Sequence, residues 1–243
     1  MADPIVLTNA TIWHGGYDLS GASNEVTFTS SREEKPHNNF GDTVDAVYPG
    51  VIQSGCEVGG FFDSDLDGPE FAQAKSQSQS WPLTVCPAGT SVGDLAYTMK
   101  GYTFNYSTLE ASWGQSLPYR LSTQPSTTAG LGRGMVVYPK TTYTANYGGG
   151  YIQLGALSAT QKLIATLHVF SIDGGSWGVW LLSDADGAAA GETQRATQTI
   201  TTAPQATTVE VFGPVTDTYW RGTVTKTGGT SITIAYTYAI VNV

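Results

Sequence analysis

Two strings in the 243-residue sequence have residue types and spacing that could support chemistry. The run Asp63–Gly68 places acids at positions one, three and five and glycine at position six, as in the first half of a calcium loop. The second half departs from that pattern, because Pro69 occupies position seven and Ala74 stands where a bidentate acid belongs. Capping of a following helix therefore explains these acids better than metal binding does. The weak metal candidates are Asp63, Asp65 and Asp67.

The second string, Gly174–Gly178, matches the G-x-S-x-G nucleophile elbow by letter. An elbow needs a helix after the serine, and here a strand pattern follows, so the string predicts a turn. The histidines His14, His37 and His168 have neither an i, i+4 partner nor a cysteine partner for zinc, and are expected to fill strands or lie on the surface. We therefore expect no catalytic residue, no cofactor-binding residue, no cofactor and no enzymatic activity.

The charge balance excludes a tight nucleic-acid ligand. Eleven Lys and Arg against twenty Asp and Glu give a net charge of −9, which is the wrong sign for gripping phosphates. Charged residues make up only 13% of the chain, which argues against a coiled coil. The acids gather in the first half, so the two halves are expected to face different surroundings.

Cys56 and Cys86 are expected to be reduced and packed, because the sequence indicates a cytosolic origin. Its start, Met1-Ala2-Asp3-Pro4, has no basic segment followed by a long apolar one, and no run of about eighteen apolar residues occurs anywhere. Synthesis in the cytoplasm and no membrane partner are therefore expected.

The elements that would position these residues are strands, because the dominant period of the apolar residues is two. Ile232–Ile240 alternates large apolar residues with Thr and Ala, which predicts a half-buried strand. The turns Asp173–Gly175 and Thr227–Gly229 are expected to close hairpins. Further strands of the second half are expected at Leu163–Ile172, Trp177–Ser183, Arg195–Thr202, Val209–Phe212 and Tyr219–Thr227. This half is predicted to be an antiparallel β-sandwich or jelly roll.

The first half also indicates strands and one helix. In Tyr97–Trp113 the apolar face changes parity at Gly101, which predicts a β-bulge there. Asp67 as N-cap and Pro69 at the first helical position predict a short helix over Glu70–Ser78. The other strands are expected at Val6–Trp13, Glu25–Ser31, Val51–Phe62 and Leu83–Cys86. The fold class is thus all-β with one short α-helix.

Composition divides the chain into two expected domains, 1–125 and 126–243. The stretch Ser122–Gly150 is rich in Ser, Thr, Gly and Pro, which is typical of a linker or a long surface crossing. Residues 1–110 hold fourteen acids and four bases, whereas 111–243 hold six acids and seven bases.

Residues 5–63 resemble the tail tube (major tail) proteins of long-tailed bacteriophages through the order of four short strings. These are Tyr17-Asp18-Leu19-Ser20-Gly21, Phe40-Gly41-Asp42-Thr43, Tyr48-Pro49-Gly50 and Gly59-Gly60-Phe61-Phe62-Asp63. Leu154–Lys162 and Gly213–Arg221 are similar to strings of the C-terminal sandwich of such virion proteins. The Asp-rich loop and Trp81-Pro82 have no counterpart in that pattern.

The resemblance implies a tail-tube-type β-sandwich for the first domain and a structural role in the virion tail. Copies of the chain would join into hexameric or trimeric rings and stack as a tube, alongside other tail proteins. Viral DNA would pass through the bore without specific binding, because an acidic wall repels phosphate. Glu25 is a further acid expected to face the bore. The candidates for the bore wall or for contacts between subunits are Glu33, Glu34, Asp42, Asp45 and Glu57.

Two other functions remain open at this point. A carbohydrate-binding sandwich module would use exposed aromatic rings as a stacking platform, although alternating aromatics in strands are more often core. Its candidate rings are Trp177, Trp180, Tyr219 and Trp220. A capsid decoration protein would share the same fold class and the same lack of an active site.

Overall fold

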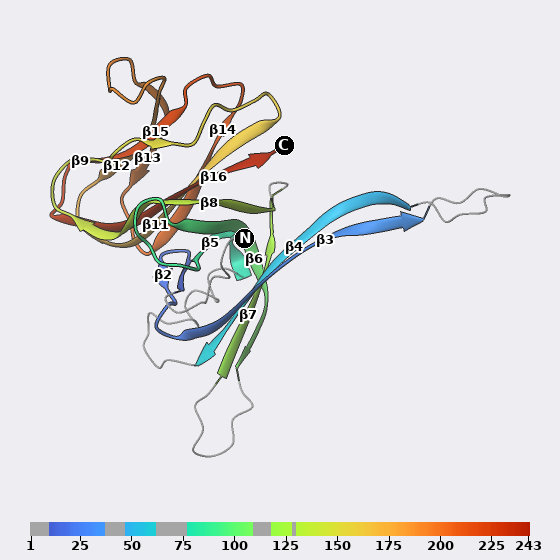
Figure 1. The fold of residues 1–243 in the computed structure, drawn as a ribbon. Coiled ribbons are helices and arrows are strands. Elements are labelled where there is room, and N and C mark those ends of the chain that lie inside the picture. Colours follow the sequence, from blue (N-terminus) through green and yellow to red (C-terminus); the bar gives the residue numbers. More distant parts are fainter. Residues whose placement is uncertain (1–9, 37–46, 62–76, 109–117, 128–129) are drawn as a thin grey trace.

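The computed structural model describes residues 10–36, 47–61, 77–108, 118–127 and 130–243. These residues form an all-β structure of two antiparallel sheets, as the sequence predicts (Figure 1). No helix in the described ranges is long and apolar enough to cross a membrane. Of the expected helix Glu70–Ser78, only Gln77 and Ser78 fall inside the described residues, and both are helical.

The large sheet contains eleven strands and includes both halves of the chain. Its strands are β1 (Thr11–His14), β2 (Tyr17–Asp18), β3 (Ser23–Pro36), β4 (Val47–Phe61), β5 (Trp81–Cys86), β6 (Leu95–Thr108), β7 (Pro118–Pro125), β8 (Leu131–Tyr143), β11 (Gln161–Asp173), β14 (Gln205–Phe212) and β16 (Ser231–Asn242). The main path runs β14-β11-β16-β8-β6-β5-β1-β2. β8 lies in the middle of this path, so the expectation of a linker over Ser122–Gly150 is wrong. Ser, Thr and Gly are tolerated there because small side chains suit a strand that is packed closely on both faces.

Strand β6 divides the large sheet into two branches. One edge of β6 pairs with β8 over Leu95–Met99 and then with β7 over Gly101–Thr108. In one branch β7 pairs with β4, which pairs with β3. In the other branch β8 pairs with β16, and the sheet continues through β11 to β14. The backbone of Gly101 lies so close to β7 that a Cβ atom would sit 2.1 Å from the Gln124 carbonyl oxygen, which explains the glycine.

The small sheet covers one face of the second branch. It contains β9 (Tyr147–Gly148), β10 (Ile152–Gln153), β12 (Trp177–Asp184), β13 (Thr193–Ile200) and β15 (Tyr219–Lys226). The core between the sheets includes Leu163, Leu167, Trp177, Trp220 and Tyr236, all at most 1% exposed. The expected strands of this half are confirmed as β11 to β16.

The two glycine turns of this half join the sheets and do not close hairpins. β11 and β16 belong to the large sheet, and β12 and β15 belong to the small one. The turns touch each other, since a Cβ atom on Gly175 would lie 2.1 Å from the Gly228 carbonyl carbon. A Gly-Gly pair signals a positive φ, which a corner between sheets requires as much as a hairpin does.

The second face of β16 is buried as well, so the expectation of a half-buried strand is wrong. Ala235 packs in a small cluster with Trp13, Cys86, Ala96 and Val136, which come from β1, β5, β6 and β8. The large sheet therefore curls until its second branch lies against the strands of the first half. Small residues occupy this face of β16 because the covering strands approach it closely.

A separate core lies in the first half. It contains Ile12, Leu19, Val58, Leu83 and Leu121, each at most 2% exposed. The members of the two main cores do not cross the expected boundary near residue 125, except that Leu131 packs against the first-half core. We propose on this basis that 1–125 and 126–243 are two domains that share a sheet.

If the second domain has its own core, the fragment 126–243 melts cooperatively in differential scanning calorimetry. Its melting temperature is lower than that of the full chain, because β8 loses its pairing with β6 and β11 loses the cover over its second face. A broad loss of structure without a heat-absorption peak would show that the two halves fold only as one unit.

Candidate functional site

The branch β6-β7-β4-β3 has one apolar and one polar face. Val58 and Leu121 point into the first-half core. The alternating positions carry Glu57, which accepts a hydrogen bond from Ser122 Oγ at 3.0 Å, and Glu25, which lies 3.5 Å from an Arg120 nitrogen. Both pairs are exposed, so each contributes little to stability. The structure thus places Glu57 and Glu25 together on a hydrophilic sheet surface.

The β3–β4 hairpin extends beyond that branch as a two-stranded ribbon (Figure 1). β7 supports β4 only over Cys56–Phe61, whereas the hairpin register continues to Pro36 and Val47. A ribbon of two strands without a further layer is only marginally stable in water. Tyr48 and Ile52 are 59% and 55% exposed on it, so the ribbon carries exposed apolar side chains.

Glu33 and Glu34 lie on this ribbon, away from Glu57. Glu33 forms an exposed ion pair with Lys35 at 3.8 Å, and Glu34 lies opposite Pro49. Asp42 and Asp45, like the weak metal candidates Asp63, Asp65 and Asp67, lie outside the described residues. Within the described ranges, no group of three or more His, Cys, Asp or Glu is arranged to hold a metal ion.

The expected bulge in β6 occurs three residues later than predicted. Thr103 pairs with Thr123 and Asn105 with Ser122, so Phe104 is the extra residue. The shift leaves Tyr102 and Phe104 on the surface, 38% and 64% exposed, with their rings 6.3 Å apart. Gly101 lies where β6 and β7 approach closely, and the bulge itself is at Phe104. No described strand pairs with the other edge of β6 beyond Gly101.

A row of hydrogen-bonded polar side chains is buried where the large sheet folds back. His168 on β11 donates from Nδ1 to the Gly15 carbonyl at 2.5 Å, and its Nε2 lies 2.8 Å from the Thr84 hydroxyl on β5. Thr98 on β6 continues the row, because its Oγ1 lies 3.3 Å from Thr84 Oγ1 and 3.1 Å from Thr166 Oγ1. These contacts join β11 to the first half through groups that are at most 4% exposed.

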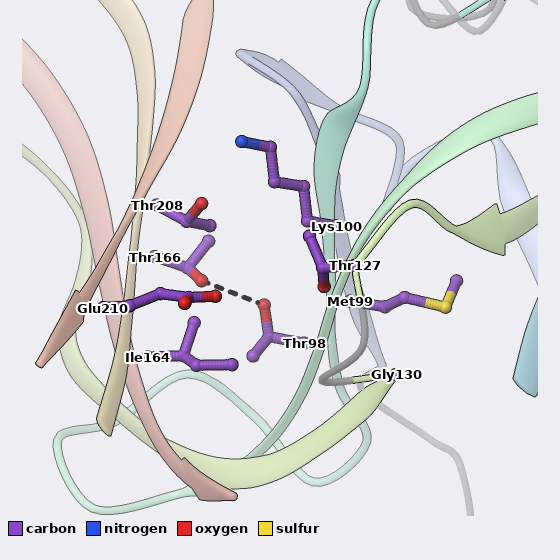
Figure 2. Close-up of a pocket in the computed structure, with 9 residues that line it drawn as sticks. All are labelled: Thr98, Met99, Lys100, Thr127, Gly130, Ile164, Thr166, Thr208 and Glu210. Atoms are coloured by element: carbon purple, nitrogen blue, oxygen red, sulfur yellow. Dashed lines mark hydrogen bonds between the residues drawn. The ribbon is translucent and has the colours of Figure 1, made fainter. Parts of the chain in front are cut away.

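A narrow cleft opens beside this row of polar side chains, between β6 and the β11–β14 pair. Figure 2 shows Thr98 and Lys100 on one side and Ile164, Thr166 and Glu210 on the other. Its cavity volume of about 10 Å³ holds about one water molecule, so it is too small for an organic ligand. Lys162 reaches the Glu210 carboxylate at 2.9 Å and neutralises it.

Burial changes the acid–base behaviour of both histidines. His14 is fully buried, neither ring nitrogen has a hydrogen-bond partner within the described part of the chain, and burial followed by the charge of His168 lowers its pKa to about 3. Burial also lowers the pKa of His168 to about 4, although the Gly15 hydrogen bond and Asp18 oppose this. Both rings are therefore neutral near pH 7 and serve the fold. Their strand-filling role agrees with the expectation from sequence.

Cys56 and Cys86 are free and buried, as expected. Burial raises the pKa of each thiol to about 12, so neither is a reactive thiolate near neutral pH. The aromatic platform expected for a carbohydrate module is not formed as a set, because Trp177 and Trp220 are fully buried in the second-half core. Trp180 remains 37% exposed, and Tyr219 is partly buried.

Solved structures that this chain is similar to include three phage or prophage proteins. The Dit protein of phage SPP1, described as a hub adsorption apparatus of phages that infect Gram-positive bacteria, matches over 95% of this chain and 98% of its own, with 13% identity and a TM-score of 0.39. The SPP1 tail tube matches over 54% and 77%, with 13% identity and a TM-score of 0.41. The baseplate of the anti-feeding prophage matches over 55% and 97%, with 10% identity and a TM-score of 0.42. No protein-family model and no curated protein matches the sequence.

The neutral buried histidines predict a loss of stability in mild acid. Their folded pKa values lie below the ordinary 6.5, so the unfolded chain binds more protons as the pH falls through 6.5. Lowering the pH from neutral to about 5 should cost about 2 kcal/mol of unfolding free energy per histidine. Urea titrations at several pH values measure this slope. His168→Gln, whose amide can replace both hydrogen bonds, should remove about half of it, and an unchanged slope in that variant would contradict the assignment.

Proposed function

We propose that this chain is a structural subunit of a phage-type tail tube that joins copies of itself edge to edge into rings. The observation that carries the proposal is the branch β6-β7-β4-β3, in which the outer edge of β3 and the edge of β6 beyond Gly101 have no described partner strand. Open edges expose rows of N–H and C=O groups that favour pairing with another chain. A repeated heterologous contact that closes on itself produces a ring.

Apolar residues near these edges favour association of copies over a soluble monomer. Tyr102 and Phe104 lie beside the free edge of β6, and Ile52 and Tyr48 lie on the ribbon that extends β4. Natural proteins usually protect long edge strands with charge, proline or a covering element. Here the sequence resemblance to tail tube proteins gives the same conclusion from independent evidence, namely the strings between Tyr17 and Asp63.

The polar face of the branch suits the wall of a bore. Glu25 and Glu57 lie there with Arg120 as the facing cation, and hydroxyl groups such as Ser122 fill the rest. Such a wall offers few cations to phosphate, so DNA passes without being held. Glu33 and Glu34, on the ribbon, would then make contacts between subunits or between stacked rings. The neutral second domain would face outward, in the virion tail.

Ile52→Lys on the ribbon should prevent ring and tube formation, because a charge would be buried without a partner in the contact between copies. The fold should keep its stability within about 0.5 kcal/mol, as is usual for surface changes. Negative-stain microscopy and light scattering after size exclusion measure the assembly. Val92→Lys is the matched control, since Val92 is equally exposed but lies away from the ribbon. Normal rings from Ile52→Lys, or a wild type that stays monomeric at high concentration, would reject this contact.

Reversing the charge of the proposed bore wall should make the rings hold DNA. In the double variant Glu25→Lys and Glu57→Lys, rings should bind duplex DNA at low salt and release it as salt rises, because counterion release drives the contact. Fluorescence anisotropy with labelled DNA measures this. Rings of Val92→Lys carry an added cation elsewhere and should behave as wild type. Equal DNA binding by both variants would place Glu25 and Glu57 outside the bore.

A further inference from the structure

Trp180, on β12 of the small sheet, is a large aromatic residue that is 37% exposed. Its neighbours Val179 and Leu181 point into the core, so the indole projects from the opposite face of β12. The ring leans over Gly178, where a Cβ atom would lie 2.9 Å from Trp180 Nε1. Glycine at 178 therefore allows the indole to lie low across the sheet.

The strands on either side of Trp180 carry only small polar residues at the same level. Thr223 on β15 and Thr197 on β13 are its direct cross-strand partners, and Gly148 on β9 lies beyond Thr223. No bulky side chain at these positions covers the indole. A single aromatic ring bordered by hydroxyl groups is unlike the core of a protein contact, which gathers several apolar side chains.

A fixed polar cluster lies one step further along the same face. Arg221, two residues from Thr223 and so about 6.8 Å along the strand, donates to the Glu192 carboxylate at 2.6 Å. The Tyr151 hydroxyl donates to the same carboxylate, and the Arg221 guanidinium lies 4.8 Å from the Tyr151 ring centre. The charges of Arg221 and Glu192 compensate each other, which leaves this part of the surface neutral but rich in hydrogen-bonding groups.

The loop that carries Glu192 is held in place from within. Asp184, 2% exposed, accepts hydrogen bonds from the backbone N–H groups of Ala185 and Ala189 at 2.8 and 3.0 Å. Asp186 accepts one from the backbone N–H group of Ala188 at 2.9 Å. The polar groups beside Trp180 are therefore positioned before any ligand arrives, which lowers the entropic cost of binding.

We propose that this face of the small sheet binds a neutral oligosaccharide. A pyranose ring has one face of C–H groups, which stacks on an indole, and a rim of hydroxyl groups, which both donate and accept hydrogen bonds. Trp180 supplies the stacking surface, Thr223 and Thr197 border it, and the Arg221–Glu192 pair receives the hydroxyl groups of a neighbouring sugar. The site uses one of the four aromatics expected from sequence, and it does not depend on assembly into rings.

The test is a printed array of neutral hexose and N-acetylhexosamine oligosaccharides, probed with the full-length protein. Wild type should bind at least one class, and titration of that sugar should change the tryptophan fluorescence. Trp180→Ala should weaken binding about tenfold or more, whereas Trp180→Phe, which keeps an aromatic face, should lose only a few-fold. Thr223→Val, which keeps the shape and removes the hydroxyl, should weaken it by a smaller factor.

Phe212→Ala is the control, because Phe212 is an exposed aromatic at the end of β14 in the large sheet, outside the proposed contacts between copies. It should bind sugar as wild type does. Circular dichroism of each variant at neutral pH confirms that the fold is kept. Absence of binding by the wild type across the array, or equal binding by Trp180→Ala, would overturn the proposal and assign the exposed indole to a protein contact. Ring formation by these variants is measured separately and is expected to be normal.

Discussion

The pairing of β6 with two successive partners along one edge is the constraint on which the rest of the structure depends. β8 takes the first part of β6 and β7 takes the second, so two branches leave the same strand in different directions. The break between β7 and β8 frees the branches to diverge while β6 keeps its backbone hydrogen bonds along this one edge. One branch then curls into a packed body with the small sheet, and the other ends in the β3–β4 ribbon.

The curl of the second branch explains the buried polar groups. β11 has large apolar residues on the face toward the small sheet, and Thr166 and His168 on the face that meets β5 and β6. Because the covering strands offer their own hydroxyl groups, these polar side chains are hydrogen-bonded although they are buried. His14 has no such partner among the described residues, and burial, followed by the charge of His168, keeps it neutral. The same packing that joins the halves therefore makes their contact sensitive to acid.

The two proposed functions use surfaces of the sheets that this packing leaves exposed. The ribbon and the outer edge of β6 expose backbone and apolar side chains, which suits association with further copies. The outer face of the small sheet instead exposes one indole among hydroxyl groups, which suits a sugar. Both surfaces belong to strands whose opposite faces or inner ends are anchored in a core, so they are presented on a rigid support.

The sequence by itself determined the all-β class, most strands of the second half and the turns at glycine, because these follow from local periodicity and backbone preference. It could not show that β8 is a central strand, that the glycine pairs join two sheets, or that the Thr and Ala face of β16 is buried. It also could not separate Trp180 from Trp177, since both lie in the same strand and only the position of the opposing sheet decides which ring is covered. Those outcomes depend on pairing between residues far apart in the chain, which alternation along a single strand does not encode.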